Sequence, residues 1–187
     1  LTANINVSDI SCNGQTDGEV DVTATGGTPA LTYDIGAGPV GSGTFTGLTA
    51  GPYTVTVVDG NNCSTTVNGT VNEPTVLTAS TGTITPEYFG ADGSVDITVS
   101  GGTTNYTYAW TGPNGYTNST QDPSNMPGGT YNVTITDASG CTVTLNNIVV
   151  PSELGVDALF NMKFNIYPNP SNGQFNIQLI DVDGVNS

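Results

Sequence analysis

The 187-residue chain contains no histidine and one cation, Lys163, against 16 acidic residues, and its formal net charge at neutral pH is −15. Without histidine it cannot form a Ser-His-Asp triad, a Cys-His dyad or a histidine-ligated metal site. Without clustered Lys and Arg it cannot neutralise nucleic-acid phosphates or an anionic membrane surface. A mechanism that uses carboxylates alone stays open, but the acids fall mostly at turns or on polar strand positions. We therefore expect no enzyme and no nucleic-acid partner.

Long apolar runs and common helix formers are also scarce. No stretch has the length of a transmembrane segment, and neither a signal peptide nor an initiating methionine stands at Leu1. We expect a piece of a longer exported protein. Thr, Gly, Asn, Val and Ser dominate, and β-branched residues alternate with polar ones in short runs between turn formers. This composition predicts an all-β protein.

The sequence repeats itself with a period of about 75 residues. Corresponding pairs are Asp17–Val22 with Asp92–Ile97, Gly26–Thr28 with Gly101–Thr103, Gly51–Val57 with Gly129–Ile135, and Asp59 and Cys63 with Asp137 and Cys141. We therefore expect three parts: a first copy over 1–75, a second copy over 76–152, and a different segment over 153–187.

Each copy reads as about six short strands. Apolar residues alternate with polar ones in both copies, at Val20, Val22, Ala24, Tyr33, Tyr53, Val55 and Val57 in the first, and at Val95, Ile97, Val99, Tyr108, Trp110, Tyr131, Val133 and Ile135 in the second. Gly26-Gly27 and Gly101-Gly102 suit tight turns with positive φ. Strands of this number and spacing predict tandem immunoglobulin-like β-sandwiches.

Three cysteines allow three single pairings. Cys12 and Cys63 flank nearly all of the first copy, and the position aligned with Cys12 in the second copy is Glu87. For an exported chain without histidine we expect a structural disulfide between Cys12 and Cys63, with Cys141 free.

The motifs are specific enough to suggest a family. Cys12-Asn-Gly, Asp17-Gly-Glu-Val, Gly26-Gly-Thr-Pro, Ala50-Gly-Pro-Tyr-Thr-Val-Thr-Val and Asn72-Glu-Pro-Thr follow in order, and the second copy repeats most of them. This pattern resembles the SprB-type repeat of Bacteroidetes surface adhesins, named for a gliding-motility adhesin. The resemblance implies a tandem array that holds a binding function away from the surface of a Gram-negative cell.

The last segment breaks the repeat. It reads as a strand, a Pro-Asn-Pro turn, a Gly turn and a second strand. The pattern is similar to the first part of the type A C-terminal sorting domain of the type IX secretion system, a β-sandwich. The resemblance implies export through the periplasm, with an outer-membrane translocon and a barrel-shaped shuttle protein as partners. The residues that would carry this signal are Phe164, Ile166, Tyr167, Pro168, Asn169, Pro170, Gly173 and Phe175.

Two further features suggest binding. Asp17, Glu19 and Asp21 alternate along one strand face, where they form a weak Ca²⁺ candidate or a solvated acidic face. Trp110, Tyr116 and Tyr88-Phe89 are candidates for stacking on surface glycans, although core packing explains Trp110 more simply.

These features leave three functions open. We expect the non-catalytic C-terminal part of a surface or secreted adhesin, exported by the type IX route. The alternatives are the spacer and sorting region of a secreted enzyme whose catalytic domain lies upstream, and a glycan-binding module.

Overall fold

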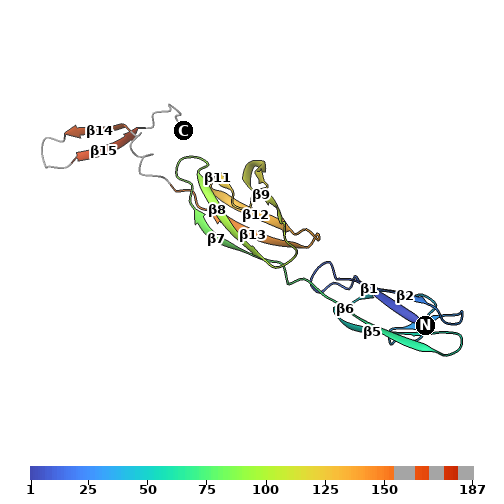
Figure 1. The fold of residues 1–187 in the computed structure, drawn as a ribbon. Coiled ribbons are helices and arrows are strands. Elements are labelled where there is room, and N and C mark those ends of the chain that lie inside the picture. Colours follow the sequence, from blue (N-terminus) through green and yellow to red (C-terminus); the bar gives the residue numbers. More distant parts are fainter. Residues whose placement is uncertain (154–162, 169–174, 181–187) are drawn as a thin grey trace. The chain divides into compact units, whose positions relative to one another are not determined.

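A computed structural model describes residues 1–153, 163–168 and 175–180 (Figure 1). Within these ranges every regular element is a strand except one short 3₁₀ turn, η1 (Pro113–Gly115). The all-β class expected from the sequence is confirmed. No helix in the described part of the chain is long and apolar enough to cross a membrane.

The chain divides into two compact units. The first comprises Leu1–Ser80, Val99–Tyr108 and Thr134–Thr144, and the second comprises Thr81–Thr98, Ala109–Val133 and Leu145–Ser187. This division differs from that of the sequence repeat, so domain boundaries near residues 75 and 152 stay a prediction. The terms first copy and second copy refer below to the sequence repeat.

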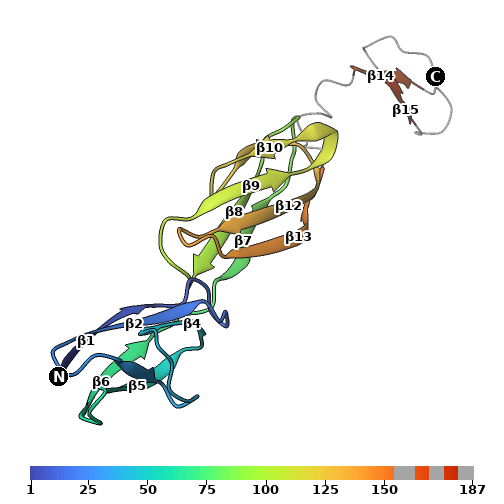
Figure 2. The same cartoon turned by 90° about the vertical axis from the view of Figure 1, so that its right-hand side faces the viewer.

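The first copy forms two three-stranded antiparallel sheets. Its strands are β1 (Thr2–Ser8), β2 (Gly18–Thr25), β3 (Thr32–Asp34), β4 (Thr44–Leu48), β5 (Gly51–Val58) and β6 (Ser64–Val71). One sheet has the order β1-β2-β4 and the other β3-β5-β6. The strands of these two sheets lie in separate layers (Figure 2). This is the sandwich arrangement that the alternating pattern predicts.

The second copy repeats this topology. Its strands are β7 (Thr78–Thr85), β8 (Gly93–Ser100), β9 (Thr107–Thr111), β10 (Thr117–Asn118), β11 (Ser124–Met126), β12 (Gly129–Thr136) and β13 (Thr142–Val150). The sheet orders are β11-β8-β7 and β10-β9-β12-β13. The extra strand β10 and the turn η1 fall where the second copy is longer than the first.

The core follows the period of two. In the first copy the buried cluster consists of Ile10, Val20, Val22, Val55, Val57 and Val71. In the second copy the buried apolar residues include Val95, Ile97, Trp110, Met126, Tyr131, Val133 and Ile135. Trp110 is 1% exposed, and its indole Nε1–H donates to the Thr120 carbonyl over 2.9 Å. The expected core role of this residue is confirmed, because a ring so placed offers no face to a ligand.

A tyrosine fixes the same corner in both copies. The Tyr53 hydroxyl donates to the Thr49 carbonyl over 2.9 Å, and the Tyr131 hydroxyl donates to the Pro127 carbonyl over 2.6 Å. Each tyrosine lies near the start of a strand, and its partner lies four residues upstream in the preceding connection. This arrangement is the tyrosine corner of immunoglobulin-like sandwiches. Burial raises the pKa of the Tyr131 hydroxyl.

We predict that Tyr131→Phe lowers the free energy of unfolding of the second copy by about 1–2 kcal/mol. The substitution keeps the ring but leaves the Pro127 carbonyl without this buried donor. Urea unfolding followed by Trp110 fluorescence measures the effect, because Trp110 is the one tryptophan of the chain. Tyr88→Phe, at a 39% exposed position, is the matched control and should change stability by less than about 0.5 kcal/mol. Equal effects of the two substitutions would contradict the assignment.

Candidate functional site

The loop between β1 and β2 carries Cys12 and accepts support from two acidic side chains, Asp17 and Glu73. The backbone N–H of Ser11 donates to Asp17 Oδ1 over 3.1 Å, and the Ser11 hydroxyl donates to Asp17 Oδ2. These two bonds, the hydroxyl bond foremost, hold the pKa of Asp17 below its ordinary value of 3.8. The Gly14 N–H donates to Glu73 Oε2 over 2.9 Å.

The same loop is tied to the segment that follows β6. Asn13 Nδ2 donates to the Pro74 carbonyl over 3.0 Å, and the Ile10 N–H donates to the Asn72 carbonyl over 2.9 Å. The Asn72 N–H in turn donates to Asp9 Oδ1 over 2.8 Å. The Cys12 loop therefore lies at the end of the first copy where β6 finishes and the chain leaves for β7.

The turn between β12 and β13 carries Cys141 and is built around one carboxylate, Asp137. Its Oδ1 accepts the N–H groups of Ser139 and Cys141 over 2.9 Å each, and its Oδ2 accepts the Thr103 N–H over 2.8 Å. The side chain is 5% exposed. The Thr103 bond, followed by the Cys141 bond, outweighs desolvation and lowers the pKa of Asp137. The carboxylate is therefore satisfied by backbone donors without a cation.

A glycine makes room for this carboxylate. Gly102 has φ +62°, and a Cβ added to it would lie 2.6 Å from Asp137 Oδ2. In the first copy Gly27 has φ +76°, and its Cβ would lie 2.8 Å from Asp59 Oδ2. The expectation of positive φ at the Gly-Gly pairs is confirmed, and close approach of an aspartate is a second reason for glycine there.

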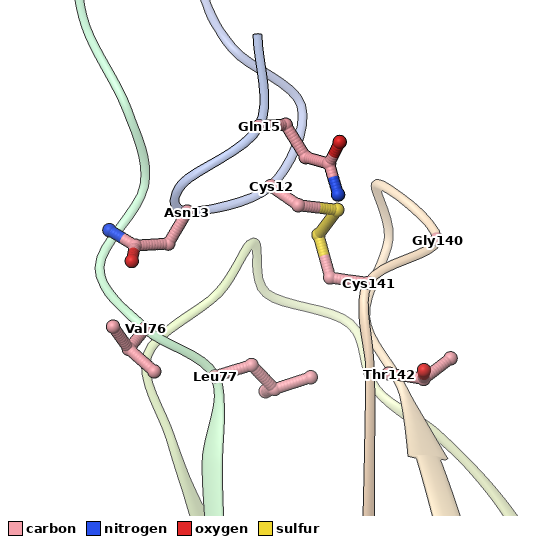
Figure 3. Close-up of a pocket in the computed structure, with 8 residues that line it drawn as sticks. All are labelled: Cys12, Asn13, Gln15, Val76, Leu77, Gly140, Cys141 and Thr142. Carbon is pink, nitrogen blue, oxygen red and sulfur yellow. A yellow bond between two sulfur atoms is a disulfide. The ribbon is translucent and has the colours of Figure 1, made fainter. Parts of the chain in front are cut away.

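The structure joins Cys12 to Cys141 (Figure 3). The Cα atoms are 5.7 Å apart, within the usual range for a disulfide, and the two residues are 129 positions apart in the sequence. Both belong to the first compact unit. The bond therefore connects the first copy of the repeat to the second. Cys63 is free and exposed.

The expected Cys12–Cys63 pairing is therefore wrong, and strand geometry gives the reason. Cys63 stands in the turn just before β6, whereas the Cys12 loop contacts Asn72, just after β6. The eight residues of β6 separate the two ends by about 25 Å at 3.3 Å per residue. A disulfide needs Cα atoms within about 7 Å. Cys12 and Cys63 flank the first copy in the sequence, but they lie at opposite ends of it in the structure.

A cavity of about 360 Å³ lies beside the disulfide. Its lining consists of Cys12, Asn13, Gln15, Val76, Leu77, Gly140, Cys141 and Thr142 (Figure 3). The lining contains no carboxylate, amine or imidazole. No group of three His, Cys, Asp or Glu side chains that could hold a metal occurs among the described residues. The chemical feature that distinguishes this site is the disulfide that joins the two copies.

The acidic calcium candidates have partners within the protein. Asp17 is engaged with Ser11 as described, and Asp21 Oδ1 accepts the hydroxyl of Thr44 over 2.8 Å. Glu19 lies on β2, opposite Ser8 of β1. Calcium binding by these residues stays a prediction.

The glycan candidates differ in exposure: Trp110 is buried, Tyr116 is half-buried, and Tyr88 and Phe89 are exposed. Tyr116 packs edge-on against Tyr131, with ring centroids 5.0 Å apart. Tyr88 and Phe89 are 39% and 55% exposed. They belong to a loop in which Asp92 Oδ1 accepts the Tyr88 N–H over 2.7 Å, as Asp17 accepts the Ser11 N–H in the first copy. The cysteine loop of the first copy thus corresponds to an aromatic loop in the second.

Five of the eight sorting-signal residues lie on a strand pair. β14 (Lys163–Pro168) pairs antiparallel with β15 (Phe175–Ile180), in register from Lys163 opposite Ile180 to Pro168 opposite Phe175. The two strands expected here are present. Phe164, Ile166, Tyr167 and Pro168 lie on β14 and Phe175 on β15, whereas Asn169, Pro170 and Gly173 lie outside the described residues. The sorting role of all eight stays a prediction.

The expected partner of Cys12 was wrong because the disulfide was expected to form within one copy, whereas the bond joins one copy to the other. The sequence did contain a signal: Asp59 and Cys63 have the same spacing as Asp137 and Cys141. Equal spacing predicts equal turns, so both second cysteines had to occupy the same place in their copies. The sequence did not show which of these two turns lies next to the Cys12 loop.

Comparison with known proteins supports the repeat. A family model described as the SprB repeat matches residues 4–39 and 89–115, one match in each copy. The match does not extend to residues 153–187. No curated protein matches the chain.

Among solved structures, the chain is similar to the C-terminal 282-residue fragment of intimin, determined in complex with the intimin-binding domain of the translocated intimin receptor. The identity is 20% and the TM-score 0.43. The alignment covers 79% of this chain and 63% of that one, so the chain spans less than two thirds of the length of the intimin fragment.

We predict that replacing Cys12 and Cys141 together by serine lowers the free energy of unfolding by up to about 5 kcal/mol. In the chain-entropy model, a bond between residues 129 apart removes that much freedom from the unfolded state. Urea unfolding measures the loss. Cys63→Ser is the matched control and should change stability by less than about 0.5 kcal/mol, because its thiol is exposed and unbonded. If Cys63→Ser destabilises as much as the double variant, the pairing is wrong.

We also predict that acid destabilises the protein partly through Asp59 and Asp137. Hydrogen bonds from backbone N–H groups, first those of Thr28 and Thr103, hold the pKa of each carboxyl below 3.8 in the folded state. Their contribution is complete above the unfolded pKa and is lost as pH falls through the lower folded pKa. The melting temperature should therefore fall as pH drops below about 4.

The variant with both Asp59→Asn and Asp137→Asn tests this cause. It should melt lower than the unmodified protein at pH 7 and show a shallower fall between about pH 4 and pH 2. Asp34→Asn is a control, because this carboxylate, at the end of β3, accepts the N–H groups of Gly36 and Gly38 in the turn that follows it. An unchanged slope in the double variant would assign the acid sensitivity to other carboxylates.

Proposed function

We propose that this chain is part of a non-catalytic cell-surface adhesin, in which SprB-type sandwiches act as structural repeats and the segment after them directs export. The observation that carries the proposal is the pair of SprB-repeat matches, one in each copy, on two sandwiches of the same topology. The covalent bond between the copies supports a mechanical role. It adds a link that unfolding of either small core would not by itself break.

The surface charge supports an extracellular location. With a net charge of −15 and one cation, separate molecules of the protein repel one another, which favours solubility and suppresses self-association. The disulfide supports the same location, because such bonds persist in oxidising compartments. The cell surface of a Gram-negative bacterium, reached through the periplasm, meets both conditions.

The export part of the proposal rests on the tail. β14 ends at Tyr167 and Pro168, the first half of the Tyr-Pro-Asn-Pro motif, and β15 begins at Phe175. This strand pair and its flanking sequence would be recognised by an outer-membrane translocon and its barrel-shaped shuttle. Edge-strand pairing is one mode by which a short hairpin can be bound.

We predict that a reporter joined to residues 153–187, with any sequence that follows Ser187 in the encoded protein, is exported by cells with a type IX system. The variant with Tyr167, Pro168, Asn169 and Pro170 all changed to alanine should stay in the periplasm. Protease accessibility on whole cells and immunoblots of the medium measure export.

The matched control carries Asp181→Asn and Asp183→Asn and should be exported normally. A strain without the translocon should retain all three proteins. Export of the alanine variant at the level of the control would remove these four residues as the address. Retention of every version in the competent strain would remove the sorting role of the segment.

A further inference from the structure

Cys63 has no partner in the chain, yet it occupies the position at which the second copy is covalently bonded. It is the one free cysteine, and it is exposed. Its counterpart by spacing from the turn aspartate is Cys141, which is bonded to Cys12 of the copy before it. The two turns can therefore be compared as the same turn with a free cysteine, Cys63, and with a disulfide-bonded cysteine, Cys141.

The hydrogen bonds of the two turns correspond one by one. Asp59 Oδ1 accepts the N–H groups of Asn61 and Cys63 over 2.9 Å each, and Asp59 Oδ2 accepts the Thr28 N–H over 2.9 Å. Asp137 makes the same three bonds in the Cys141 turn, within 0.1 Å in each length. The Asp59 N–H also donates to the Cys63 carbonyl over 2.9 Å, and the matching bond in the second turn has the same length. Cys63 is thus held in the backbone frame in which Cys141 forms its bond.

The surroundings correspond as well. A Cβ on Gly27 would meet Leu1, and a Cβ on Gly102 would meet Leu77, so Leu1 stands in the first copy where Leu77 stands in the second. In the second copy the Gly102 N–H donates to the carbonyl of Thr75, which belongs to the end of the copy before it. Residues 1–187 include no further copy that supplies the corresponding groups to the first copy.

We propose that Cys63 is the attachment point for a further repeat of the same kind on its N-terminal side, through a disulfide to the cysteine at the Cys12 position of that repeat. The bonds would follow one rule along an array: the first cysteine of each copy pairs with the second cysteine of the next. This inference rests on the repeat and its disulfide, and does not depend on the export route or on adhesion.

The chemistry balances with a small disulfide as oxidant. Two thiols, Cys63 and the incoming cysteine, lose two protons and two electrons as their S–S bond forms. Oxidised glutathione accepts them and becomes two glutathione thiols by thiol–disulfide exchange. The reaction is favoured within one chain, because tethering gives the incoming cysteine a high effective concentration. A bond between separate chains is disfavoured by their net charges of −15.

The test is a longer chain in which a duplicate of residues 1–76, called the added copy, is placed directly before Leu1. This length makes Leu1 follow Val76 of the added copy, as Leu77 follows Val76 in the protein itself. The reduced chain is refolded in a mixture of reduced and oxidised glutathione, and its disulfides are mapped by mass spectrometry of peptides without reduction. The unextended chain is treated in parallel and must form Cys12–Cys141.

The expected result is that Cys12 of the added copy is bonded to Cys63, that Cys12–Cys141 is retained, and that alkylation finds one thiol per chain, Cys63 of the added copy. In the matched control, Cys63→Ser in the original copy should leave Cys12 of the added copy alkylatable. A second version carries Cys63→Ser in the added copy alone, so that no pairing within that copy can compete. It should give the same bond and no free thiol.

Three results would overturn the proposal. One is an original Cys63 that stays alkylatable in both extended versions while Cys12–Cys141 forms. Another is a bond between the two cysteines of one copy. The third is a dimer on a non-reducing gel that disappears with Cys63→Ser, which would assign Cys63 to contacts between chains.

Discussion

The structure depends on carboxylates that must be satisfied without cations. With 16 acids and one Lys or Arg, ion pairs cannot neutralise the buried or half-buried acids, and backbone N–H groups take that role. Asp59 and Asp137 each accept three such bonds, and Glu87 accepts the N–H groups of Ala91 and Gly128. Each carboxylate organises a turn, and the depressed pKa values show that the ionised form is the one held. Each of these turns connects two neighbouring antiparallel strands.

The covalent junction follows from those turns. Because Asp137 fixes the backbone of the Cys141 turn, the thiol is presented at one end of the second copy, where the Cys12 loop of the first copy reaches it. Small sandwiches with few buried apolar residues gain from such a bond, since surface-to-volume scaling limits what their cores supply. A protein that must transmit force along repeated modules would gain in the same way, which links the disulfide to the proposed adhesin role.

Much of the fold could be predicted because it is periodic. Val20 and Val22, or Val55 and Val57, point into the core for the reason that residues two apart share a face of a strand. The Gly-Gly pairs have positive φ because tight turns there need it. The disulfide could not be predicted in this way. Its pairing depends on which end of a strand each loop occupies, and β6 carries Cys63 away from Cys12 although both bound the same copy. The alignment of Cys12 with Glu87 did place the loop of Tyr88 and Phe89 opposite the Cys12 loop, but the hydrogen bonds that Asp17 and Asp92 make in these two loops could not be predicted.

By itself, the sequence determined the all-β class, the twofold repeat, the strand faces and the exclusion of histidine-based and cation-based chemistry. These properties are local or compositional: they follow from alternation, turn residues and charge within a few positions. The tertiary structure alone decided that Cys12 bonds Cys141, that Cys63 is left exposed, and that Asp59 and Asp137 are shielded from solvent. Those properties depend on distances between residues tens of positions apart, which are set when two sheets pack and each strand carries its ends to opposite sides of the sandwich.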